Sequence, residues 1–542
     1  MCGLVCVFKN ESPLEKSFEK LIQNSLQLLN HRGPDESEVY RVDENALFAH
    51  ARLSIVGLED GRQPLKAIDG RGAQITWVHN GEIYNHKDLR EELALTSKAS
   101  HSDSVVIGEG YLKWGVSIFD KLDGVFATVL YHKGEVIAAR DPLGVKPLYF
   151  GESQEGVLAF ASEMKALQGI CDEVHTFPAG HYYTRKEGFV CYYRPHFREE
   201  RPELREDVFS KLEGALRKSV RKRLMADVEV GALLSGGLDS SLVAAIACQE
   251  LKKKGKQLHT FSVGLDPLSD DLKYARMVSE HIGSIHHEII FTEEEGMESL
   301  SEMIYHLETF DITTVRASTP MFIMAKKIRE LGIKVVLSGE GADEIFGGYL
   351  YFRNAPGAKE FHKECIRRVG LLYSADLLRA DRSTMGAGVE ARVPFLDKEF
   401  LELSMSIDPE LKMVTEQRCE KWILRKAFSK EALIPDEILW RQKEQFSDGV
   451  GYSWVDRLKE RAESLFSDRQ FEEAKNQYKH LPPVSKEALM YRMLFEKHYP
   501  LESIAAQSKA WIPKWQENSD PSGRANADHV RTTEKKSFTL SA

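Results

Sequence analysis

The sequence predicts two successive domains of different fold class, an α+β domain followed by an α/β domain. Up to about residue 195, short alternating strands dominate, each bounded by Gly, Asn, Asp or Pro, whereas helices alternate with short apolar strands after that point. Between the two patterns, residues 198–205 are highly charged and contain a proline, which makes them the best linker candidate. A chain of 542 residues is long enough for two or three domains.

The first domain is expected to contain one helix and several short strands. Apolar residues recur at helical spacing over residues 14–30, which predicts the helix. Strands interrupted by a single helix predict antiparallel sheets packed in layers. The expected strands are residues 3–8, 47–51, 75–79, 125–131, 135–139 and 158–161.

The second domain is expected to contain a parallel sheet that helices cover on both faces, because its strands are short, apolar and separated by helices. Residues 360–512 are expected to be mostly helical. The other expected helices are 208–225 and 240–254, and the expected strands are 230–234, 258–263 and 335–337.

Composition and charge exclude several classes of function. A formal net charge of −10 argues against nucleic acid as a partner, because proteins that bind its phosphate backbone normally carry a basic face. Seven cysteines without a C-x-x-C pair indicate reduced thiols and a cytoplasmic protein. The sequence lacks the ~18 consecutive apolar residues of a membrane span, so we expect no membrane partner. The polar closing segment, residues 516–542, lacks periodicity and is expected to be a mobile tail.

The second residue, Cys2, is a candidate nucleophile. Removal of Met1 would place a free α-amine beside its thiol, so that one residue supplies both the attacking sulfur and the base that takes its proton. The alternative interpretation is that Cys2 and Cys6 are small apolar residues of the first strand.

Residues 235–241, Ser-Gly-Gly-Leu-Asp-Ser-Ser, follow an apolar strand and open a helix. Glycines let the backbone approach an anion, and the helix N-terminus and serine hydroxyls supply donors, so the segment suits a phosphate group. It matches neither the P-loop of nucleoside triphosphatases nor a dinucleotide fingerprint. A glycine turn capped by serines is the alternative. The motif resembles the PP-loop of ATP pyrophosphatases, which cleave ATP between the α and β phosphates.

A second loop, residues 338–349, carries three carboxylates among glycines and also follows an apolar strand. It therefore lies at the carboxyl end of a strand, where open α/β sheets bind their ligands. Carboxylates beside phosphate oxygens suit Mg²⁺, so the loop is a candidate magnesium-pyrophosphate site. The alternative is a solvated acidic turn.

Several motifs together resemble a known family. The early motifs resemble a class II glutamine amidotransferase: Cys2-Gly3, HRGPD at 31–35, RLSIV at 52–56, NGEIYN at 80–85 and Ser102-Asp103. With the PP-loop and three later motifs, the chain resembles the glutamine-hydrolysing asparagine synthetase family over about residues 1–515. The later motifs are SGEG at 338–341, GVEARVPFLD at 388–397 and WRQKEQF at 440–446.

The resemblance implies a fold and a reaction. It implies a four-layer αββα nucleophile-hydrolase domain at 2–195, then a parallel-sheet PP-loop domain with a helical C-terminal part at 206–515. The implied reaction consumes L-glutamine, L-aspartate and ATP with Mg²⁺, and makes asparagine through β-aspartyl-AMP and internally transferred ammonia. A homodimer is a possible assembly.

The resemblance also assigns the glutamine site. A zwitterionic substrate needs a cation for its carboxylate and an anion for its ammonium, and Arg52 and Asp103 match these roles. Cys2 would attack the side-chain amide, and Asn80 and Gly81 would stabilise the resulting oxyanion. As alternatives, Asn80 and Gly81 could form only a hairpin turn and Arg52 a surface ion pair. The rest of the pocket would be Leu53, Ser54, Ile55, Val56 and Glu82.

In the second site, the resemblance assigns Asp239 and Asp343 to magnesium. Glu340 would serve adenylate formation or accept a proton from ammonia, and Lys443 could neutralise phosphate charge. By themselves, Lys443 and Arg316 would more often be solvated charges. Thr313 and Arg316 resemble residues that bind aspartate and the intermediate. The implied ATP-binding residues are Leu234, Ser235, Gly236, Gly237, Asp239, Ser240, Ser241, Val263, Ser338, Gly339 and Tyr349.

Two rival functions remain at this point. One is an amidotransferase of the same architecture that amidates another carboxylate, such as a peptide acid or a nucleotide precursor. The other is a glutamine or nucleotide sensor that binds without synthesis, which would need neither a nucleophile nor an acid or base.

Overall fold

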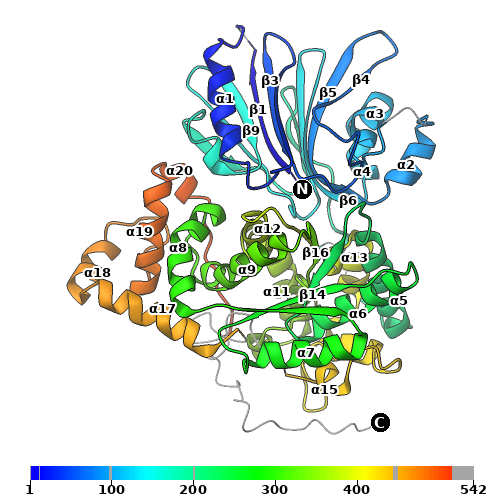
Figure 1. Cartoon of the computed structure of the whole chain (residues 1–542), viewed down its shortest axis with the longest axis vertical. Coiled ribbons are helices and arrows are strands. Elements are labelled where there is room, and N and C mark those ends of the chain that lie inside the picture. Colours follow the sequence, from blue (N-terminus) through cyan, green and yellow to red (C-terminus); the bar gives the residue numbers. More distant parts are fainter. Residues whose placement is uncertain (1, 11, 97–99, 199–201, 443–449, 516–542) are drawn as a thin grey trace.

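The computed structural model describes residues 2–10, 12–96, 100–198, 202–442 and 450–515. The chain forms two stacked domains, one built around antiparallel strands and one in which helices surround a smaller sheet (Figure 1). The first domain ends near β12 (Gly188–Cys191), and the second begins near α5 (Val208–Arg223).

Two six-stranded antiparallel sheets form the centre of the first domain. The first sheet contains, in spatial order, β10 (Glu173–Thr176), β8 (Tyr149–Glu152), β9 (Val157–Ala161), β1 (Cys2–Lys9), β3 (Ala46–Arg52) and β2 (Glu36–Arg41). The second contains β12, β11 (His181–Thr184), β7 (Glu135–Arg140), β6 (Gly124–His132), β5 (Gln74–Ile83) and β4 (Leu65–Ile68).

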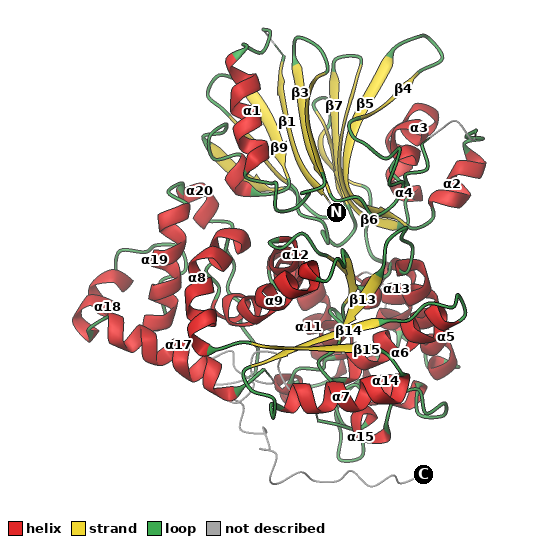
Figure 2. Ribbon diagram, viewed as in Figure 1, coloured by secondary structure: helices red, strands yellow, loops and turns green. Residues whose placement is uncertain are grey.

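Helices cover the outer faces of both sheets (Figure 2). Along β1, Leu4 and Cys6 belong to the core between the sheets, whereas Val5 and Val7 belong to the core that includes α1 (Ser17–Gln27). Residues of a strand alternate between its two faces, so β1 is buried on both sides. The second sheet is covered by α2 (His86–Glu92), α3 (Val105–Trp114) and α4 (Ile118–Lys121). These layers confirm the expected αββα domain.

All six expected strands of this domain are present, and so is the expected helix. The expectation of a single helix was wrong, because α2, α3 and α4 also belong to this domain. The sequence pattern missed β2, β4, β8, β10, β11 and β12, which have four to six residues each. Several of them lie at sheet edges with exposed or half-buried side chains, so they lack the apolar alternation that reveals a strand.

A five-stranded parallel sheet forms the centre of the second domain. Its spatial order is β15 (Ile285–Ile290), β14 (His259–Gly264), β13 (Val230–Leu233), β16 (Val335–Leu337) and β17 (Glu390–Arg392). The order reverses between β13 and β16. A crevice at the carboxyl ends of the strands is expected at such a point.

The expected parallel sheet is confirmed, and α-helices account for most of the described residues after 360, as expected. Two strands of this sheet, β15 and β17, were not expected, and the sequence of β17, Glu-Ala-Arg, has no strand pattern. The helices are α5, α6 (Leu238–Lys252), α7 (Asp270–Ile282), α8 (Glu293–Leu307), α9 (Ile312–Glu330), α10 (Ala342–Phe346), α11 (Ala358–Leu371), α12 (Asp376–Met385), α13 (Lys398–Ser406), α14 (Trp422–Ala427), α15 (Asp436–Leu439), α17 (Tyr452–Leu465), α18 (Asp468–Lys475), α19 (Lys486–His498) and α20 (Glu502–Ala505).

Short 3-10 helices occur at Gly115–Ser117, Met164–Ala166, His196–Arg198, Leu350–Asn354, Leu372–Ser374, Pro394–Leu396 and Pro409–Leu411. Within the described ranges, no helix combines the length and apolar character that crossing a bilayer requires.

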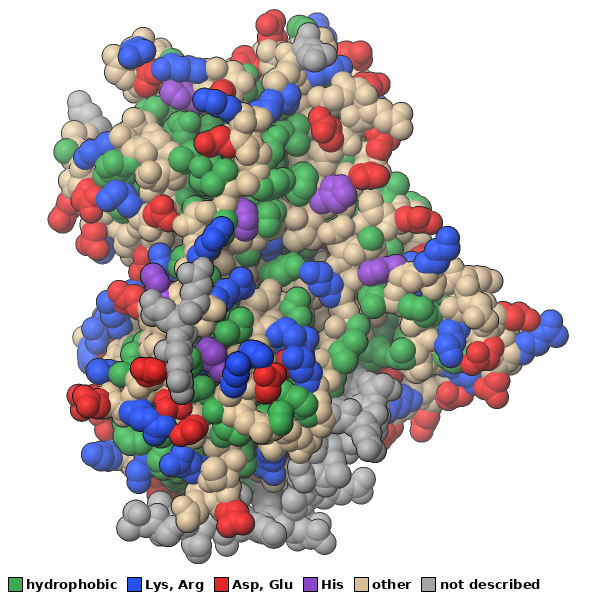
Figure 3. Space-filling view, turned by 180° about the vertical axis from the view of Figure 1, so that it is seen from behind, with side chains coloured by type: hydrophobic (Ala, Val, Ile, Leu, Met, Phe, Trp, Pro, Cys, Tyr) green, Lys and Arg blue, Asp and Glu red, His purple; other side chains and the backbone are tan. Residues whose placement is uncertain are grey.

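The connection between the domains is partly ordered. The Leu204 backbone N–H donates to the carbonyl oxygen of Ser406 at 3.0 Å, and the Asp408 N–H donates to the Leu204 carbonyl at 3.1 Å. Residues 199–201 of the expected linker, and the expected tail at 516–542, lie outside the described residues. Acidic and basic side chains intermingle over the face of both domains shown in Figure 3.

Candidate active sites

Cys2 lies at the start of β1, opposite Arg52 of the neighbouring strand β3. Its backbone nitrogen donates to the side-chain oxygen of Asn80 at 2.9 Å. Burial raises the pKa of the Cys2 thiol, and the Leu53 backbone N–H opposes that rise. Cys6 instead belongs to the core between the sheets. The two cysteines of this strand therefore occupy different environments, and Cys2 alone is beside the predicted glutamine residues.

Asn80 and Gly81 lie within β5 and pair with β6, so they do not form a hairpin turn. Asn80 is fully buried, and its amide nitrogen has no hydrogen-bond partner. A buried donor without a partner costs free energy, and a ligand oxygen would satisfy it. Gly81 has a φ of +148°, and a Cβ there would lie 1.9 Å from the Val125 carbonyl oxygen. Glycine is therefore required at this position.

The Arg52 guanidinium is buried and shapes the loop that follows β3. It donates to the carbonyl oxygens of Gly57 at 2.6 Å and Leu58 at 3.3 Å, and pairs with Glu36 at 2.9 Å. Arg52 is thus not a surface ion pair. The loop between these contacts contains the predicted pocket residues Leu53, Ser54, Ile55 and Val56.

Asp103 is buried beside the end of β5, where its carboxylate accepts a hydrogen bond from the Ile83 backbone at 2.7 Å. Burial raises the pKa of Asp103 to about 6. Glu82 is also buried, and burial raises its pKa. Its carboxylate pairs with Arg392 of the second domain at 3.1 Å. The structure therefore places all the predicted glutamine-site residues around the start of β1 and the end of β5.

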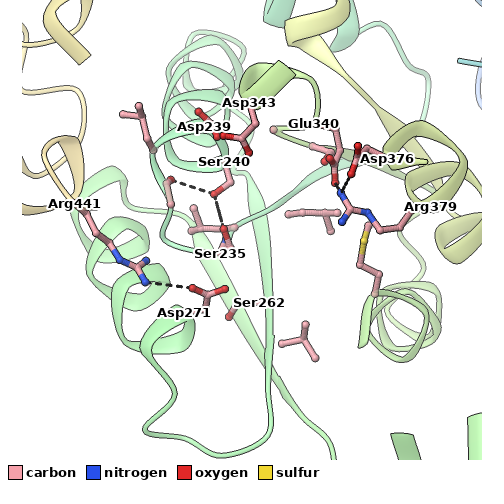
Figure 4. A pocket seen from close by; sticks show the side chains of 18 of the residues that line it. Ser235, Asp239, Ser240, Ser262, Asp271, Glu340, Asp343, Asp376, Arg379 and Arg441 are labelled. Atoms are coloured by element: carbon pink, nitrogen blue, oxygen red, sulfur yellow. Dashed lines mark hydrogen bonds and ion pairs between the residues drawn. The ribbon is translucent and has the colours of Figure 1, made fainter. Parts of the chain in front are cut away.

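A cavity lies at the carboxyl ends of β13 and β16, where the strand order reverses (Figure 4). Most of the residues predicted for ATP, aspartate or metal line this cavity. They are Leu234, Ser235, Gly237, Asp239, Ser240, Val263, Thr313, Ser338, Gly339, Glu340, Asp343 and Tyr349.

The predicted phosphate loop connects β13 to α6. The side chains of Ser235 and Ser240 are 3.2 Å apart, and the Ser240 hydroxyl also accepts from the Ser235 backbone N–H at 3.2 Å. Gly236 has a φ of +68°, and a Cβ there would lie 2.5 Å from Tyr274. Gly236 and Ser241 are part of the loop but are not among the residues that line the cavity.

The two predicted metal ligands share a lysine. The Lys421 ammonium lies 2.5 Å from an Asp239 carboxylate oxygen and 2.6 Å from an Asp343 oxygen. The carboxylates come from the first turns of two helices, α6 and α10, and converge on one cation position. In the part of the chain that the structure describes, no group of three His, Cys, Asp or Glu side chains forms a metal cluster.

Glu340 faces the opposite side of the cavity, where it contacts Arg379 (Figure 4). The Arg379 guanidinium lies 2.6 Å from a Glu340 oxygen and 3.3 Å from Asp376. Thr313 also lines the cavity, and its buried hydroxyl has no hydrogen-bond partner. Arg379 and Asp376 belong to α12, and Arg379 holds its guanidinium between Asp376 and the predicted acid or base.

Arg316 is placed differently from its neighbour Thr313. Its guanidinium donates to both carboxylate oxygens of Glu487 on α19, at 2.8 and 2.6 Å, and it does not line the cavity. It is buried in an ion pair rather than solvated. Lys443 lies outside the described residues.

Several cavity residues were not predicted. Arg441 donates to the Gly236 carbonyl oxygen at 3.2 Å, and its guanidinium stacks over the Tyr274 ring at 4.0 Å. Asp271 could have been found, because it opens a helix just after an apolar strand. Ser262 precedes the predicted Val263 on the same strand, and Arg441 and Gln442 belong to the WRQKEQF motif, so these residues also had a signal. Asp376, Arg379, Lys421, Arg425 and Trp511 come from distant segments without a motif of their own. The missed lining residues with functional groups include Ser262, Asp271, Asp376, Arg379, Lys421, Arg425, Arg441, Gln442 and Trp511.

Comparison with known proteins identifies the family. Residues 1–194 match the glutamine amidotransferase domain model, and residues 211–358 and 353–519 match the asparagine synthase model. The chain is 45% identical to a probable glutamine-hydrolysing asparagine synthetase of Dictyostelium discoideum, over 98% of this chain and 100% of the relative. This chain belongs to the family of glutamine-hydrolysing asparagine synthetases.

Other members of the asparagine synthetase family align over similar lengths. The probable enzyme of Schizosaccharomyces pombe is 47% identical over 98% of this chain and 99% of its own. Asparagine synthetase 1 of Saccharomyces cerevisiae is 46% identical over 98% of this chain and 100% of its own. The resemblance found in the motifs therefore extends along almost the whole chain.

Proposed function

We propose that the chain catalyses glutamine-dependent asparagine synthesis. The reaction converts ATP, L-aspartate, L-glutamine and water to AMP, pyrophosphate, L-asparagine and L-glutamate. The observation that carries this proposal is the alignment of glutamine-hydrolysing asparagine synthetases along nearly the full length of the chain. The aligned length includes both the Cys2 site and the cavity at the strand reversal. We further propose the cytoplasm as its compartment, in line with seven free cysteine thiols.

Before the first half-reaction can begin, removal of Met1 converts the Cys2 backbone nitrogen to a free α-amine. This amine accepts the thiol proton, and the sulfur attacks the glutamine side-chain amide. The Asn80 amide nitrogen, which lacks a partner in the structure, then donates to the developing oxyanion together with the Gly81 backbone N–H. Water releases glutamate from the thioester after ammonia has left.

The glutamine backbone is held by opposite charges. Arg52 binds its carboxylate and Asp103 its ammonium. Both side chains are buried, so these contacts form in a site of low polarity where they are stronger than in water. Leu53, Ser54, Ile55, Val56 and Glu82 complete the pocket.

In the second half-reaction, Leu234 and Val263 border the adenosine, and the backbone of Ser338 and Gly339 holds it. The remaining predicted loop residues and Tyr349 surround the phosphates. Aspartate displaces pyrophosphate from ATP to form β-aspartyl-AMP, and ammonia then displaces AMP. Adenylation is required because a carboxylate is a poor electrophile.

Magnesium fits the loop pair that holds Lys421. Asp239 and Asp343 already converge on one cation position, and Mg²⁺ favours one or two carboxylates together with phosphate oxygens. When bound, it would neutralise charge on the departing pyrophosphate. Lys421 keeps the two carboxylates together in the absence of ligand.

Glu340 is assigned to adenylate formation or to accepting a proton from the attacking ammonia. Arg379 fixes the orientation of its carboxylate. Thr313 presents its free hydroxyl to aspartate or the intermediate. The proposed roles of Arg316 in binding the intermediate and of Lys443 at the phosphates come from the family resemblance.

A product assay tests the proposal. Purified protein with glutamine, aspartate and MgATP should form asparagine, AMP and pyrophosphate in equal amounts. Pyrophosphate release should require aspartate and no other carboxylic acid. Release stimulated by a different acid would instead support an amidotransferase with another substrate, and binding of glutamine and ATP without products would support a sensor.

A further inference from the structure

A cluster of buried charges lies where the two domains meet, outside the cavity at the strand reversal. Opposite charges are present in equal number and pair across the domain boundary. The first domain contributes Arg32, Glu163 and Lys165, and the second contributes Glu308, Asp381 and Arg382; all six side chains are buried.

Within this cluster, Arg32 joins the second domain to the backbone of Cys2. Its Nε donates to the Cys2 carbonyl oxygen at 3.1 Å. The other two guanidinium nitrogens donate to both carboxylate oxygens of Asp381, at 2.8 and 3.2 Å. This two-point contact fixes the plane of the guanidinium, which a single contact would leave free to rotate. Glu163 of the first domain also accepts from Arg32, at 2.8 Å.

Helix α12 presents different residues to the two domains. Asp376 and Arg379 line the synthetase cavity, whereas Asp381 contacts Arg32 and does not line that cavity. A substitution at Asp381 therefore removes a contact to the first domain without removing a cavity residue.

We propose that Asp381, a residue of the synthetase domain, is a positioning residue for the Cys2 nucleophile. Cys2 is held at its nitrogen by Asn80 and at its carbonyl oxygen by Arg32. Loss of Met1 leaves Cys2 connected to the chain on one side only, so the carbonyl contact limits how far the amine and thiol can turn away from the oxyanion donor. This inference rests on the proposed glutaminase role of Cys2.

The test is Asp381→Asn, which keeps the size of the side chain and removes its charge. Glutamine hydrolysis should fall roughly 10- to 100-fold, because small displacements of a reacting group have effects of that order. The loss should appear in kcat, with KM for glutamine within about threefold, since Arg52 and Asp103 still bind the substrate. Asparagine synthesis from ammonium chloride should stay within about twofold of wild type.

Asp381→Glu keeps the carboxylate. Equal loss of the glutamine and ammonium activities in both Asp381→Asn and Asp381→Glu would overturn the proposal. Recovery of glutamine hydrolysis in Asp381→Glu would support it. Unchanged hydrolysis in a folded Asp381→Asn protein would also overturn it.

A double-mutant cycle checks that Asp381 acts through Arg32. Arg32→Lys combined with Asp381→Asn should hydrolyse glutamine no more slowly than Arg32→Lys alone, because the shared contact is already lost. If the double variant lost activity by the product of the two single-variant factors, Asp381 would act independently of Arg32, which would contradict the proposal.

The matched control is Lys222→Met. Lys222 also reaches across the domains, to Asp123 at 2.7 Å, but it is not part of the Arg32 cluster. Its loss should leave glutamine hydrolysis within about twofold of wild type. Reduced hydrolysis in this control would show that any damage to the domain junction lowers glutamine hydrolysis. That result would contradict a specific role for Asp381. If the wild-type protein did not hydrolyse glutamine at all, the proposed function itself would be wrong. Failure of the proposed function can therefore be told apart from failure of the Asp381 proposal.

Discussion

The two sites differ in how their polar groups are paired before any substrate binds. In the glutamine site, Asn80 keeps a buried amide nitrogen without a partner, on a strand whose backbone is fixed by its neighbours. In the synthetase cavity, Lys421 pairs with two aspartates and Arg379 pairs with Glu340. The unpaired amide of Asn80 lies where we propose that an oxyanion develops, whereas Lys421 and Arg379 must exchange their ion pairs for contacts to ligands. Each site also holds one group of the other kind, because Arg52 pairs with Glu36 in the first site and the Thr313 hydroxyl lacks a partner in the second.

The largest expected effect separates the two sites completely. Cys2→Ala should abolish asparagine formation from glutamine and leave formation from ammonium chloride within about twofold of wild type, because the cavity is untouched. Both rates are measured at saturating aspartate and MgATP. Cys6→Ala is the matched control, since Cys6 lies on the same strand but inside the core, and it should retain glutamine hydrolysis. Loss of the ammonium activity in a folded Cys2→Ala protein would refute the separation.

Glu340→Ala tests the second site, the cavity at the strand reversal. Aspartate-dependent pyrophosphate release should fall by about 10²- to 10⁴-fold, the usual range for loss of a general acid or base. Glutamine hydrolysis should continue, because Glu340 pairs with Arg379 in the cavity and not with the Cys2 site. Near-normal asparagine synthesis by this variant would remove Glu340 from the mechanism.

The unpaired donor of the first site can be tested with Asn80→Ala. Glutamine hydrolysis should lose about 10²- to 10³-fold in kcat, as expected for loss of one oxyanion donor. Its effect on KM should be small, because neither charged anchor changes. A variant in which only KM rises would mean that Asn80 binds the ground state instead.

The raised pKa of Asp103 predicts a pH dependence for the first site alone. Burial raises this pKa to about 6, so the carboxylate that we propose to hold the glutamine ammonium becomes protonated as the pH falls below that value. KM for glutamine should then rise about tenfold in total between pH 7 and 5, with most of the rise below pH 6, measured as glutamate formation. Asp103→Asn should bind glutamine weakly at every pH. A flat profile in the wild type would contradict the assignment of Asp103.

The smallest expected effect concerns the internal ion pairs of the second site. Lys421→Met should lower the free energy of unfolding by about 2 kcal/mol without ligand, because two partly buried carboxylates lose their shared cation. Magnesium chloride should then raise the melting temperature of the variant more than that of the wild type. Equal stabilisation of both proteins by Mg²⁺ would mean that the two aspartates do not bind the metal.

The two sites also differ in how many of their residues could be predicted from the sequence alone. Each glutamine-site residue belongs to a short local motif, and the structure places these motifs together. Lys421, Arg379 and Trp511 reach the second site from separate helices or segments, and no local pattern marks them. Arg316 shows the same limit, because its partner Glu487 lies 171 residues later in the chain. Strand β17 was missed because Glu390 and Arg392 bury charges that a strand pattern does not contain.

The position of Trp511 has a consequence for how the protein is made. This residue forms part of the cavity wall, and its backbone N–H donates to an Asp311 carboxylate oxygen at 2.8 Å. Domains generally fold in order as a chain leaves the ribosome, so the strands of the first domain are complete while Asp381 and Trp511 are still to be synthesised. A chain that stops before Asp381 thus lacks the carboxylate that contacts Arg32, and one that stops before Trp511 lacks part of the cavity wall. On these grounds, we expect a chain that stops before residue 381 to hydrolyse glutamine slowly and one that stops before residue 511 to form little AMP.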